Sequence, residues 1–247
     1  MPAGTEYEST EIIADCHCPG GATAESMESA APTTINKTGA RLFLVRHGEP
    51  RQHSDRIFLG QTNVPLSDRG REQAAAAGEE LARLNCHPDR VYSSDLLRAR
   101  ETAEIISARL GRAPIVDVAA FRELNMGVWD GELIENIRQR FPDEYIKRGN
   151  DILNYRVPCG ENFNDLRERV VREFKRILRE EFLPTRRAAR EHDLVIVSHL
   201  GVIHTLIAEL TRKDMNAVMQ RRRPTGTVFV WAMSEQSITC ADIVESV

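Results

Sequence analysis

Arg41-Leu-Phe-Leu-Val-Arg-His-Gly-Glu49 is the stretch that decides the fold of this chain of 247 residues. The apolar run from Leu42 to Val45 is short and continuous, which favours a strand buried on both faces, since a helix would need a longer periodic pattern. Arg46 and His47 follow at its carboxyl end, the side on which open α/β sheets bind ligands. The sequence therefore predicts a buried strand that aims a guanidinium and an imidazole into a crevice.

A second stretch of the same design lies far along the chain, at Asp193-Leu-Val-Ile-Val-Ser-His-Leu-Gly201. It again has an apolar run, which His199 follows with a glycine close behind. One such motif would be weak evidence, because short motifs often occur by chance. Two copies predict two buried strands whose histidines meet in one site.

The composition is that of an ordinary soluble protein, with 41% hydrophobic and 28% charged residues. Residues 1–38 hold six acidic residues and one lysine and so carry a charge of −5, which leaves +1 for the remainder given the net charge of −4. The nearly neutral remainder argues against nucleic acid as a partner. No stretch has the roughly 20 apolar residues of a membrane span, and the N-terminus has no signal-peptide pattern. Scattered cysteines fit a reducing cytoplasm, so we expect a cytoplasmic protein without a membrane partner. A homo-oligomer is neither indicated nor excluded.

The chain divides into a tail, residues 1–38, and one domain, residues 39–247. The tail is rich in small, polar and acidic residues without sustained periodicity, which predicts disorder. Cys16-His17-Cys18 lies within it and offers only adjacent candidates, with no second cluster at zinc spacing, so we expect no metal site there. No internal repeat divides the remainder.

Strand and helix patterns alternate along the domain, which predicts parallel crossovers and an α/β fold. We expect a single three-layer α/β/α domain with a mostly parallel central sheet. Helices are expected over 68–84 with Ser67 as cap, 96–110 with Ser94 or Asp95 as cap, 135–141 before Pro142, 162–182 with Asn162 as cap, and 201–210. Strands are expected over 42–45, 90–94, 115–120, 194–197, 227–233 and 237–244.

Charged side chains follow four of these segments and converge on one sheet edge. They are Arg46, His47, Arg98, Glu123 and His199. Arginine is permanently charged and suits a bidentate grip on phosphate oxygens. Clustered positive charge disfavours protonation of one more group, so one histidine is expected to stay neutral and nucleophilic near pH 7. These residue types predict a site for a phosphate dianion. Arg221-Arg-Arg223 is interpreted as solvated charge.

These residues resemble, in order, the histidine phosphatase superfamily, the phosphoglycerate mutase-like proteins. The resemblance covers about residues 40–235. It rests on six blocks: Arg46 to Glu49; Pro65-Leu-Ser67 with Gly70 and Gln73-Ala74; Ser93 to Ala99 with Thr102-Ala103; Arg122-Glu-Leu124 with Gly127 and Trp129 to Gly131; Gly160-Glu161; and Ser198 to Gly201.

The resemblance implies in-line phosphoryl transfer in which His47 attacks phosphorus and water then hydrolyses the phosphohistidine. Arg46, Arg98 and His199 would clamp the phosphate oxygens. Glu123 would protonate the leaving oxygen and later take a proton from water. It implies no metal and no organic cofactor.

Four positions depart from the family pattern, and one of them, Asn162 in place of Ser, is a mild change because Asn also caps helices. Pro50 and His53 stand where Thr and Asn are common, and Leu59 replaces a small polar residue, which predicts a more apolar pocket on that side. His53 and Gly60 are further candidates for substrate binding.

The function expected from the resemblance is a phosphomonoesterase acting on a small phosphorylated metabolite, with α-ribazole phosphate as one candidate. The chain between Glu123 and His199 is short for a mutase, and the mutase-specific residues after the glutamate are absent. A phosphoglycerate mutase is the nearest alternative. A non-catalytic phospholigand-binding protein is the alternative from another class.

Overall fold

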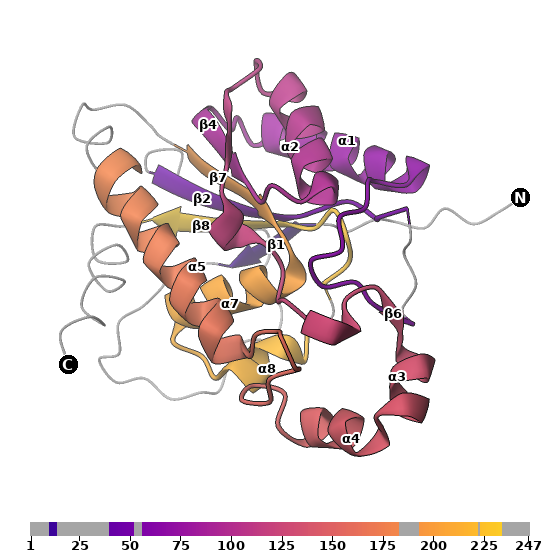
Figure 1. Cartoon of the computed structure of the whole chain (residues 1–247). Coiled ribbons are helices and arrows are strands. Elements are labelled where there is room, and N and C mark those ends of the chain that lie inside the picture. The colour runs from indigo at the N-terminus through magenta and orange to yellow at the C-terminus, as the bar shows by residue number, and fades with distance from the viewer. Residues whose placement is uncertain (1–9, 14–39, 52–55, 183–192, 222, 234–247) are drawn as a thin grey trace, which may run out of the picture.

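The computed structural model describes residues 10–13, 40–51, 56–182, 193–221 and 223–233 (Figure 1). His53, Cys16-His17-Cys18 and the strand expected over 237–244 lie outside these residues. Within the expected tail, residues 10–13 form a strand at the edge of the sheet.

The central sheet of the described residues has six strands in the order β1-β8-β2-β7-β4-β5. Every neighbouring pair is parallel except β2 and β8, so the prediction of a mostly parallel sheet is confirmed. The strands are β1 (Thr10–Ile13), β2 (Ala40–Arg46), β4 (Pro88–Ser93), β5 (Ile115–Asp117), β7 (Asp193–Ser198) and β8 (Val228–Met233).

Helices cover both faces of the sheet, which confirms the three layers (Figure 1). On one face α1 (Asp68–Arg83) and α2 (Leu97–Arg109) pack over Phe43 and Val45. On the other, α5 (Phe163–Ile177) and α7 (Leu200–Thr211) pack over Leu42 and Leu44. These four β2 side chains are at most 1% exposed, as expected of a strand whose alternate residues enter two cores.

Side-chain caps begin two of the expected helices where the sequence places them. The Ser67 hydroxyl accepts the Gly70 N–H at 3.0 Å, and Asn162 forms a reciprocal capping box with Asp165. The expected cap of α2 is wrong, because Leu96 occupies the cap position without a side-chain bond. Asp95 instead forms an ion pair with Arg122 at 2.5 Å, which holds the pKa of the carboxyl below its usual value.

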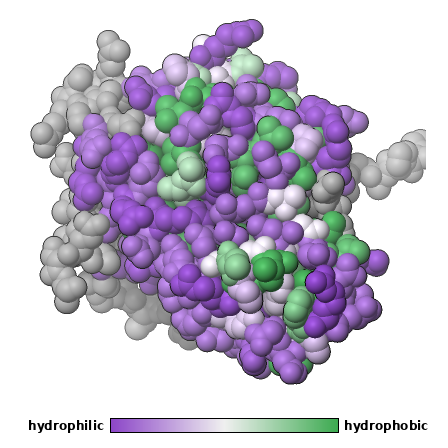
Figure 2. Space-filling view, viewed as in Figure 1, coloured by the Kyte–Doolittle hydropathy of each residue, from purple (hydrophilic) through white to green (hydrophobic). Residues whose placement is uncertain are grey.

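The middle of the chain, with α3 (Ile134–Arg140), α4 (Pro142–Asn150) and β6 (Glu132–Leu133), lies to one side of the central sheet and its covering helices (Figure 1). Strands β3 (Ile57–Phe58) and β6 pair antiparallel, and α3 and α4 follow. Pro142 ends one helix and begins the next, since proline at a first helical position gives up no needed N–H. Large apolar side chains are exposed here, among them Val128, Leu133 and Ile146, and Figure 2 shows apolar patches in this lower part of a largely hydrophilic face.

Other departures from the expected elements are small. The strand expected over 115–120 ends at Asp117, and a short 3-10 turn, Ala119–Phe121, follows it. The helix expected over 162–182 is α-helical to Ile177 and continues as a π-turn, Leu178–Phe182. A short helix, α8 (Met215–Met219), was not expected. None of the described helices combines the length and the apolar character that crossing a bilayer would require.

Candidate active site

The register between β2 and β7 brings the two histidine motifs together. Arg46 lies opposite Ser198, so His47 and His199 leave adjacent strand ends side by side. The main-chain N–H of His47 donates to the main-chain carbonyl of Ser198 at 2.9 Å. The centroids of the two imidazole rings are 5.0 Å apart. Because these strands run parallel, both side chains lie at the carboxyl edge of the sheet, where ligands bind in such folds.

His47 is held in one tautomer by its own turn. Its Nδ1 lies 2.7 Å from the Gly48 carbonyl oxygen, which can only accept a hydrogen bond, so Nδ1 carries the proton. The opposite nitrogen, Nε2, therefore keeps a lone pair and accepts from Arg98 Nε at 3.3 Å. Gly48 itself packs against Gly70, whose carbonyl oxygen would lie only 2.2 Å from an added Cβ. The ring is thus oriented with its unprotonated nitrogen toward the arginine.

Arg98 enters the site from the first turn of α2 and is buried, with 1% of its surface exposed. Its two terminal nitrogens donate to the carbonyls of Thr62 and Gly60 at 2.8 and 2.7 Å. Burial lowers its pKa to about 10, so the guanidinium remains charged at neutral pH. Gly60 has a φ of +47°, which favours glycine. It lines the cavity described below, and its carbonyl contacts Arg98.

His199 is completely buried beside these cations. Burial, and then the charge of Arg98, lower its pKa well below the usual value. Its Nε2 shares a hydrogen bond of 2.8 Å with the Ser94 hydroxyl, while its Nδ1 has no partner in the described part of the chain. A neutral His199 therefore adds no positive charge to this cluster of His47, Arg98 and Arg46.

Glu123 is fixed by the N-terminus of α7. Its carboxylate accepts the Leu124 N–H at 2.8 Å through Oε1 and the Gly201 N–H at 3.2 Å through Oε2. An added Cβ on Gly201 would lie 2.3 Å from Oε1, so only glycine allows this close approach. The carboxylate lines the same cavity as His47 and Arg98.

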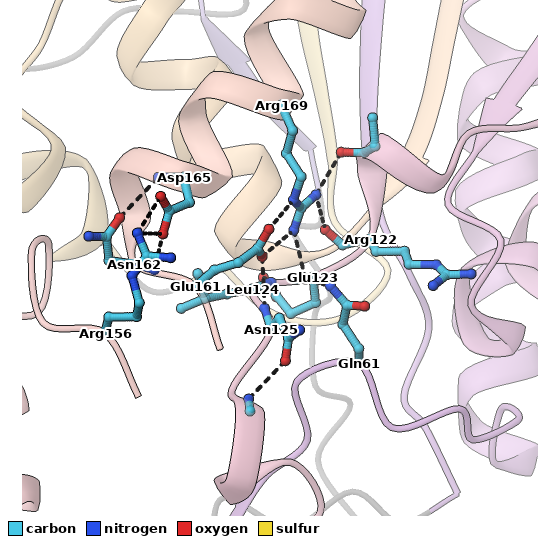
Figure 3. A network of polar contacts seen from close by, with 12 residues as sticks. Gln61, Arg122, Glu123, Leu124, Asn125, Arg156, Glu161, Asn162, Asp165 and Arg169 are labelled. Carbon is cyan, nitrogen blue, oxygen red and sulfur yellow. Dashed lines mark hydrogen bonds and ion pairs between the residues drawn. The ribbon is translucent and has the colours of Figure 1, made fainter. Parts of the chain in front are cut away.

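Arg169 on α5 holds the segment that carries Glu123 (Figure 3). It donates to the carbonyls of Ala120, Arg122 and Glu123 at 2.7 to 2.9 Å. Glu161 binds the same guanidinium through both carboxylate oxygens and accepts the Asn125 N–H at 3.0 Å. Sequence reasoning placed Glu161 in a motif without a role and missed Arg169, because contacts to main-chain carbonyls leave no motif.

Asp130 organises the opposite side of the site and was also given no role. Its Oδ1 accepts the N–H groups of Gln61 and Met126 at 3.2 and 3.0 Å, which braces the loop whose carbonyls hold Arg98. An added Cβ on Gly60 would lie 1.6 Å from that oxygen. Burial raises the pKa of this carboxyl.

Arg223 is a structural residue, so its interpretation as solvated charge is wrong. It is 4% exposed, lies over the Phe229 ring and bonds His204 Nε2 at 3.2 Å. Its carbonyl accepts a hydrogen bond from Arg46, which orients that guanidinium at the end of β2. The apolar ring and the main-chain acceptors explain why this arginine is buried.

Part of this set lines a cavity of about 470 Å³, whereas the completely buried His199 and the supporting residues Asp130, Arg169 and Arg223 are not in its lining. Arg46, His47, Arg98 and Glu123 line the floor, whereas the walls are mostly apolar. The wall residues include Pro50, Ile57, Phe58, Leu59, Met126 and Phe163. Leu59 thus contributes to the apolar side that its departure from the family pattern predicts.

Comparisons with known proteins identify relatives of this chain in sequence and in fold. The chain is 31% identical over 168 residues to phosphoglycerate mutase-like protein 4 of Arabidopsis thaliana. The aligned region covers 68% of this chain and 69% of that protein. It is 35% identical over 130 residues to GpmB, a probable phosphoglycerate mutase of Citrobacter koseri. This alignment covers 53% of this chain and 59% of the length of that relative.

Solved structures of two phosphatases are similar in fold. The α-ribazole phosphatase of Shigella flexneri has a TM-score of 0.69 and 27% identity, with coverage of 79% of this chain and 92% of that one. A mycobacterial glucosyl-3-phosphoglycerate phosphatase has a TM-score of 0.68 and 25% identity, with coverage of 81% and 93%. The family model of the histidine phosphatase superfamily, branch 1, matches residues 42–245, and the chain therefore belongs to that superfamily.

Proposed function

We propose that this protein is a phosphomonoesterase that hydrolyses a small phosphorylated metabolite through a phosphohistidine at His47, without a metal ion. Residues 39–247 would form the catalytic domain of a cytoplasmic enzyme. The observation that carries the proposal is the His47 ring, whose Nδ1 is bonded to the Gly48 carbonyl and whose Nε2 lone pair faces Arg98. A nucleophile needs an unprotonated nitrogen held in a fixed direction, and the contacts at Nδ1 and Nε2 support both.

In the first step the lone pair of His47 Nε2 attacks phosphorus, and the bond from phosphorus to the ester oxygen breaks. Arg46, Arg98 and His199 would stabilise the charge that spreads over the equatorial oxygens. Glu123, protonated at this stage, would give its proton to the leaving oxygen so that an alcohol departs.

In the second step water attacks the phosphohistidine while Glu123 takes one of its protons. The bond from phosphorus to nitrogen breaks, its electron pair returns to Nε2, and phosphate is released. A dianionic phosphate next to His199 would raise the pKa of that imidazole, because an opposite charge favours the protonated form. Its buried Nδ1 would then gain an anionic partner.

Phosphoglycerate mutase activity is the second candidate, and the names of the Arabidopsis and Citrobacter relatives favour it. The short chain between Glu123 and His199 and the names of the two similar solved phosphatases favour the phosphatase. Incubation with 3-phosphoglycerate and a bisphosphate primer separates the two. We expect release of inorganic phosphate from other esters and no rapid isomerisation; fast isomerisation without release would reject the phosphatase.

Replacement of the nucleophile tests the chemistry itself. We expect His47→Ala to lower the turnover of p-nitrophenyl phosphate by at least about a thousandfold, because no other described group in the cavity offers an imidazole lone pair in that position. Acid-labile labelling by a phosphorylated substrate should disappear as well. Circular dichroism would check that the variant is folded, and normal turnover in a folded variant would refute the assignment.

A further inference from the structure

The segment 223–227, which leads into β8, holds the carboxyl end of β2. The N–H of Gly226 donates to the carbonyls of Arg46 and His47 at 3.1 and 3.2 Å. The guanidinium of Arg46 in turn donates to the carbonyl of Arg223. The direction of the Arg46 side chain in the cavity therefore depends on where this segment lies.

The side chain of Arg223 fixes the segment from inside the protein. Its Nη1 donates to the Val218 carbonyl of α8 at 2.7 Å and lies 3.2 Å from His204 Nε2 on α7. The guanidinium carbon is 5.7 Å from the centroid of the Phe229 ring, and the residue is 4% exposed. A buried donor without an acceptor is costly, so these acceptors decide where the guanidinium can lie. They tie the segment to α7, α8 and β8.

His204 provides the side-chain acceptor in this group of contacts. A guanidinium nitrogen can only donate, so the contact with Arg223 requires an unprotonated Nε2. Burial, and then the charges of Arg223 and Arg46, lower the pKa of this imidazole to about 4, which keeps it neutral near pH 7. His204 is 5% exposed and lines the cavity, as Arg46 does. Its Nε2 lone pair is engaged with Arg223, so this imidazole does not serve as a second nucleophile.

We propose that His204 is a positioning residue for phosphate binding: through Arg223 it holds the segment 223–227 against the end of β2 and thereby fixes Arg46. This inference rests on the proposed phosphatase function and adds to it a residue that acts through another. A cation that is directed before the phosphate arrives stabilises the transition state without first having to move. A small displacement of such a group is costly in rate.

Substitutions at His204 separate its acceptor atom from the bulk of its ring. His204→Phe keeps a ring but has no acceptor, whereas His204→Gln places an amide oxygen near the position of Nε2. We expect His204→Phe to lower kcat/KM for p-nitrophenyl phosphate about tenfold or more, and to weaken the binding of inorganic phosphate about threefold or more in isothermal titration calorimetry. His204→Gln should stay within about threefold of the wild type in both measurements, because it can still accept from Arg223. His204→Leu, which is smaller, takes the place of the Phe variant if circular dichroism shows that the larger ring prevents folding.

Thr211 provides a control on the same helix. Its hydroxyl donates to the Ile207 carbonyl at 2.6 Å, and the residue does not line the cavity. Thr211→Val therefore removes one polar contact from α7 without touching the group of contacts around Arg223. It should leave kcat/KM and the phosphate affinity within about twofold of the wild type.

Double substitutions test whether the effect passes through Arg46. Residues that act through one shared group have effects that do not add. Added to Arg46→Lys, His204→Phe should therefore lower kcat/KM by less than about threefold. Added to Arg98→Lys, it should keep its full effect of about tenfold, because Arg98 is held by the carbonyls of Thr62 and Gly60 instead. The phosphate affinities of the same proteins give this comparison without requiring turnover.

Three results would overturn the inference. A folded His204→Phe variant with wild-type activity and phosphate affinity would show that the contact with Arg223 is not needed. Equal losses in His204→Gln and His204→Phe would show that the acceptor atom is not what matters. Equal further losses on Arg46→Lys and on Arg98→Lys would show that His204 only supports the cavity as a whole.

The two proposals can fail separately. If the wild type binds inorganic phosphate but hydrolyses no phosphomonoester and forms no phosphohistidine, the phosphatase proposal fails while the affinities still decide the role of His204. If the wild type hydrolyses esters but His204→Phe behaves like Thr211→Val, only the positioning role is rejected. If the wild type neither binds phosphate nor hydrolyses an ester, both proposals fail.

Discussion

Arg169 is the residue on which the position of the proposed proton donor depends. Its three carbonyl contacts fix the segment that carries Glu123, and Glu161 neutralises its charge. We expect Arg169→Met to lower kcat about tenfold to a hundredfold with a smaller effect on KM, since a small displacement of a catalytic group is costly. Kinetics across about pH 5 to 8 should also show a displaced acidic or basic limb, because the environment of the carboxylate changes.

Arg172 provides a matched control for this substitution. It lies on the same helix, is exposed, and among the described residues pairs only with Glu168, at 3.3 Å. Arg172→Met should leave kcat and the pH profile unchanged. Arg169→Lys should restore part of the activity, because one ammonium replaces only some of the contacts. An unchanged pH profile in folded Arg169→Met would show that the network is only structural.

Sequence motifs mark the imidazole and charged side chains of the candidate site, but they do not mark residues that hold the site by binding the main chain. His47, Arg98 and His199 could be predicted to share a site because each belongs to a motif at an expected strand or helix end. Arg169 and Asp130 contact carbonyl and N–H groups, which every residue has, so nothing in the pattern marks them. The tautomer of His47 likewise depends on the turn geometry at Gly48, which only coordinates provide.

At the scale of elements, the start of α7 must approach Glu123 closely. We expect Gly201→Ala to lower kcat by about tenfold or more, because the new Cβ would lie 2.3 Å from the carboxylate. The melting temperature should change little, since alanine favours the helix by about 1 kcal/mol and offsets part of the crowding. Steady-state kinetics and thermal unfolding would measure the two effects.

Gly149 near the end of α4 is the control, because an added Cβ there meets nothing within 4 Å. Gly149→Ala should leave kcat unchanged. If Gly201→Ala were as active as the wild type, the carboxylate would not need its present position.

Buried strands could be predicted from sequence because β2 and β7 are continuous apolar runs with both faces covered. The caps at Ser67 and Asn162 could be predicted for a similar reason, since a local side-chain contact defines them. The start of α2 could not. Asp95 is drawn to Arg122, a partner 27 positions away, and such a tertiary contact overrides the local preference.

The whole molecule should lose stability as the pH falls, through its buried imidazoles. Burial, and then Arg223 and Arg46, lower the pKa of His204 from 6.5 to about 4. Between these values the unfolded chain binds a proton that the folded protein does not, so the free energy of unfolding decreases as the pH decreases. One such group contributes a slope of up to about 1.4 kcal/mol per pH unit, and the contribution is complete above the unfolded pKa.

Replacement of His204 isolates its share from that of His199 and the carboxylates. We expect His204→Gln to flatten the pH dependence of stability between about pH 4.5 and 6.5, as urea unfolding would measure. His87→Gln should leave the slope unchanged, because that side chain is exposed. Equal slopes in the wild type and His204→Gln would mean that His204 is protonated alike in both states.

The place of β2 between β7 and β8 also has a consequence for how the protein is made. A ribosome delivers β2 early, whereas most of the chain must emerge before both neighbours exist. Until then the β2 segment of the nascent polypeptide exposes apolar side chains on both faces and unpaired backbone groups on both edges, which promotes aggregation. The sheet can therefore form around β2 only after β7 and β8 have been synthesised. A chaperone that binds the β2 segment until then should raise the yield of folded protein.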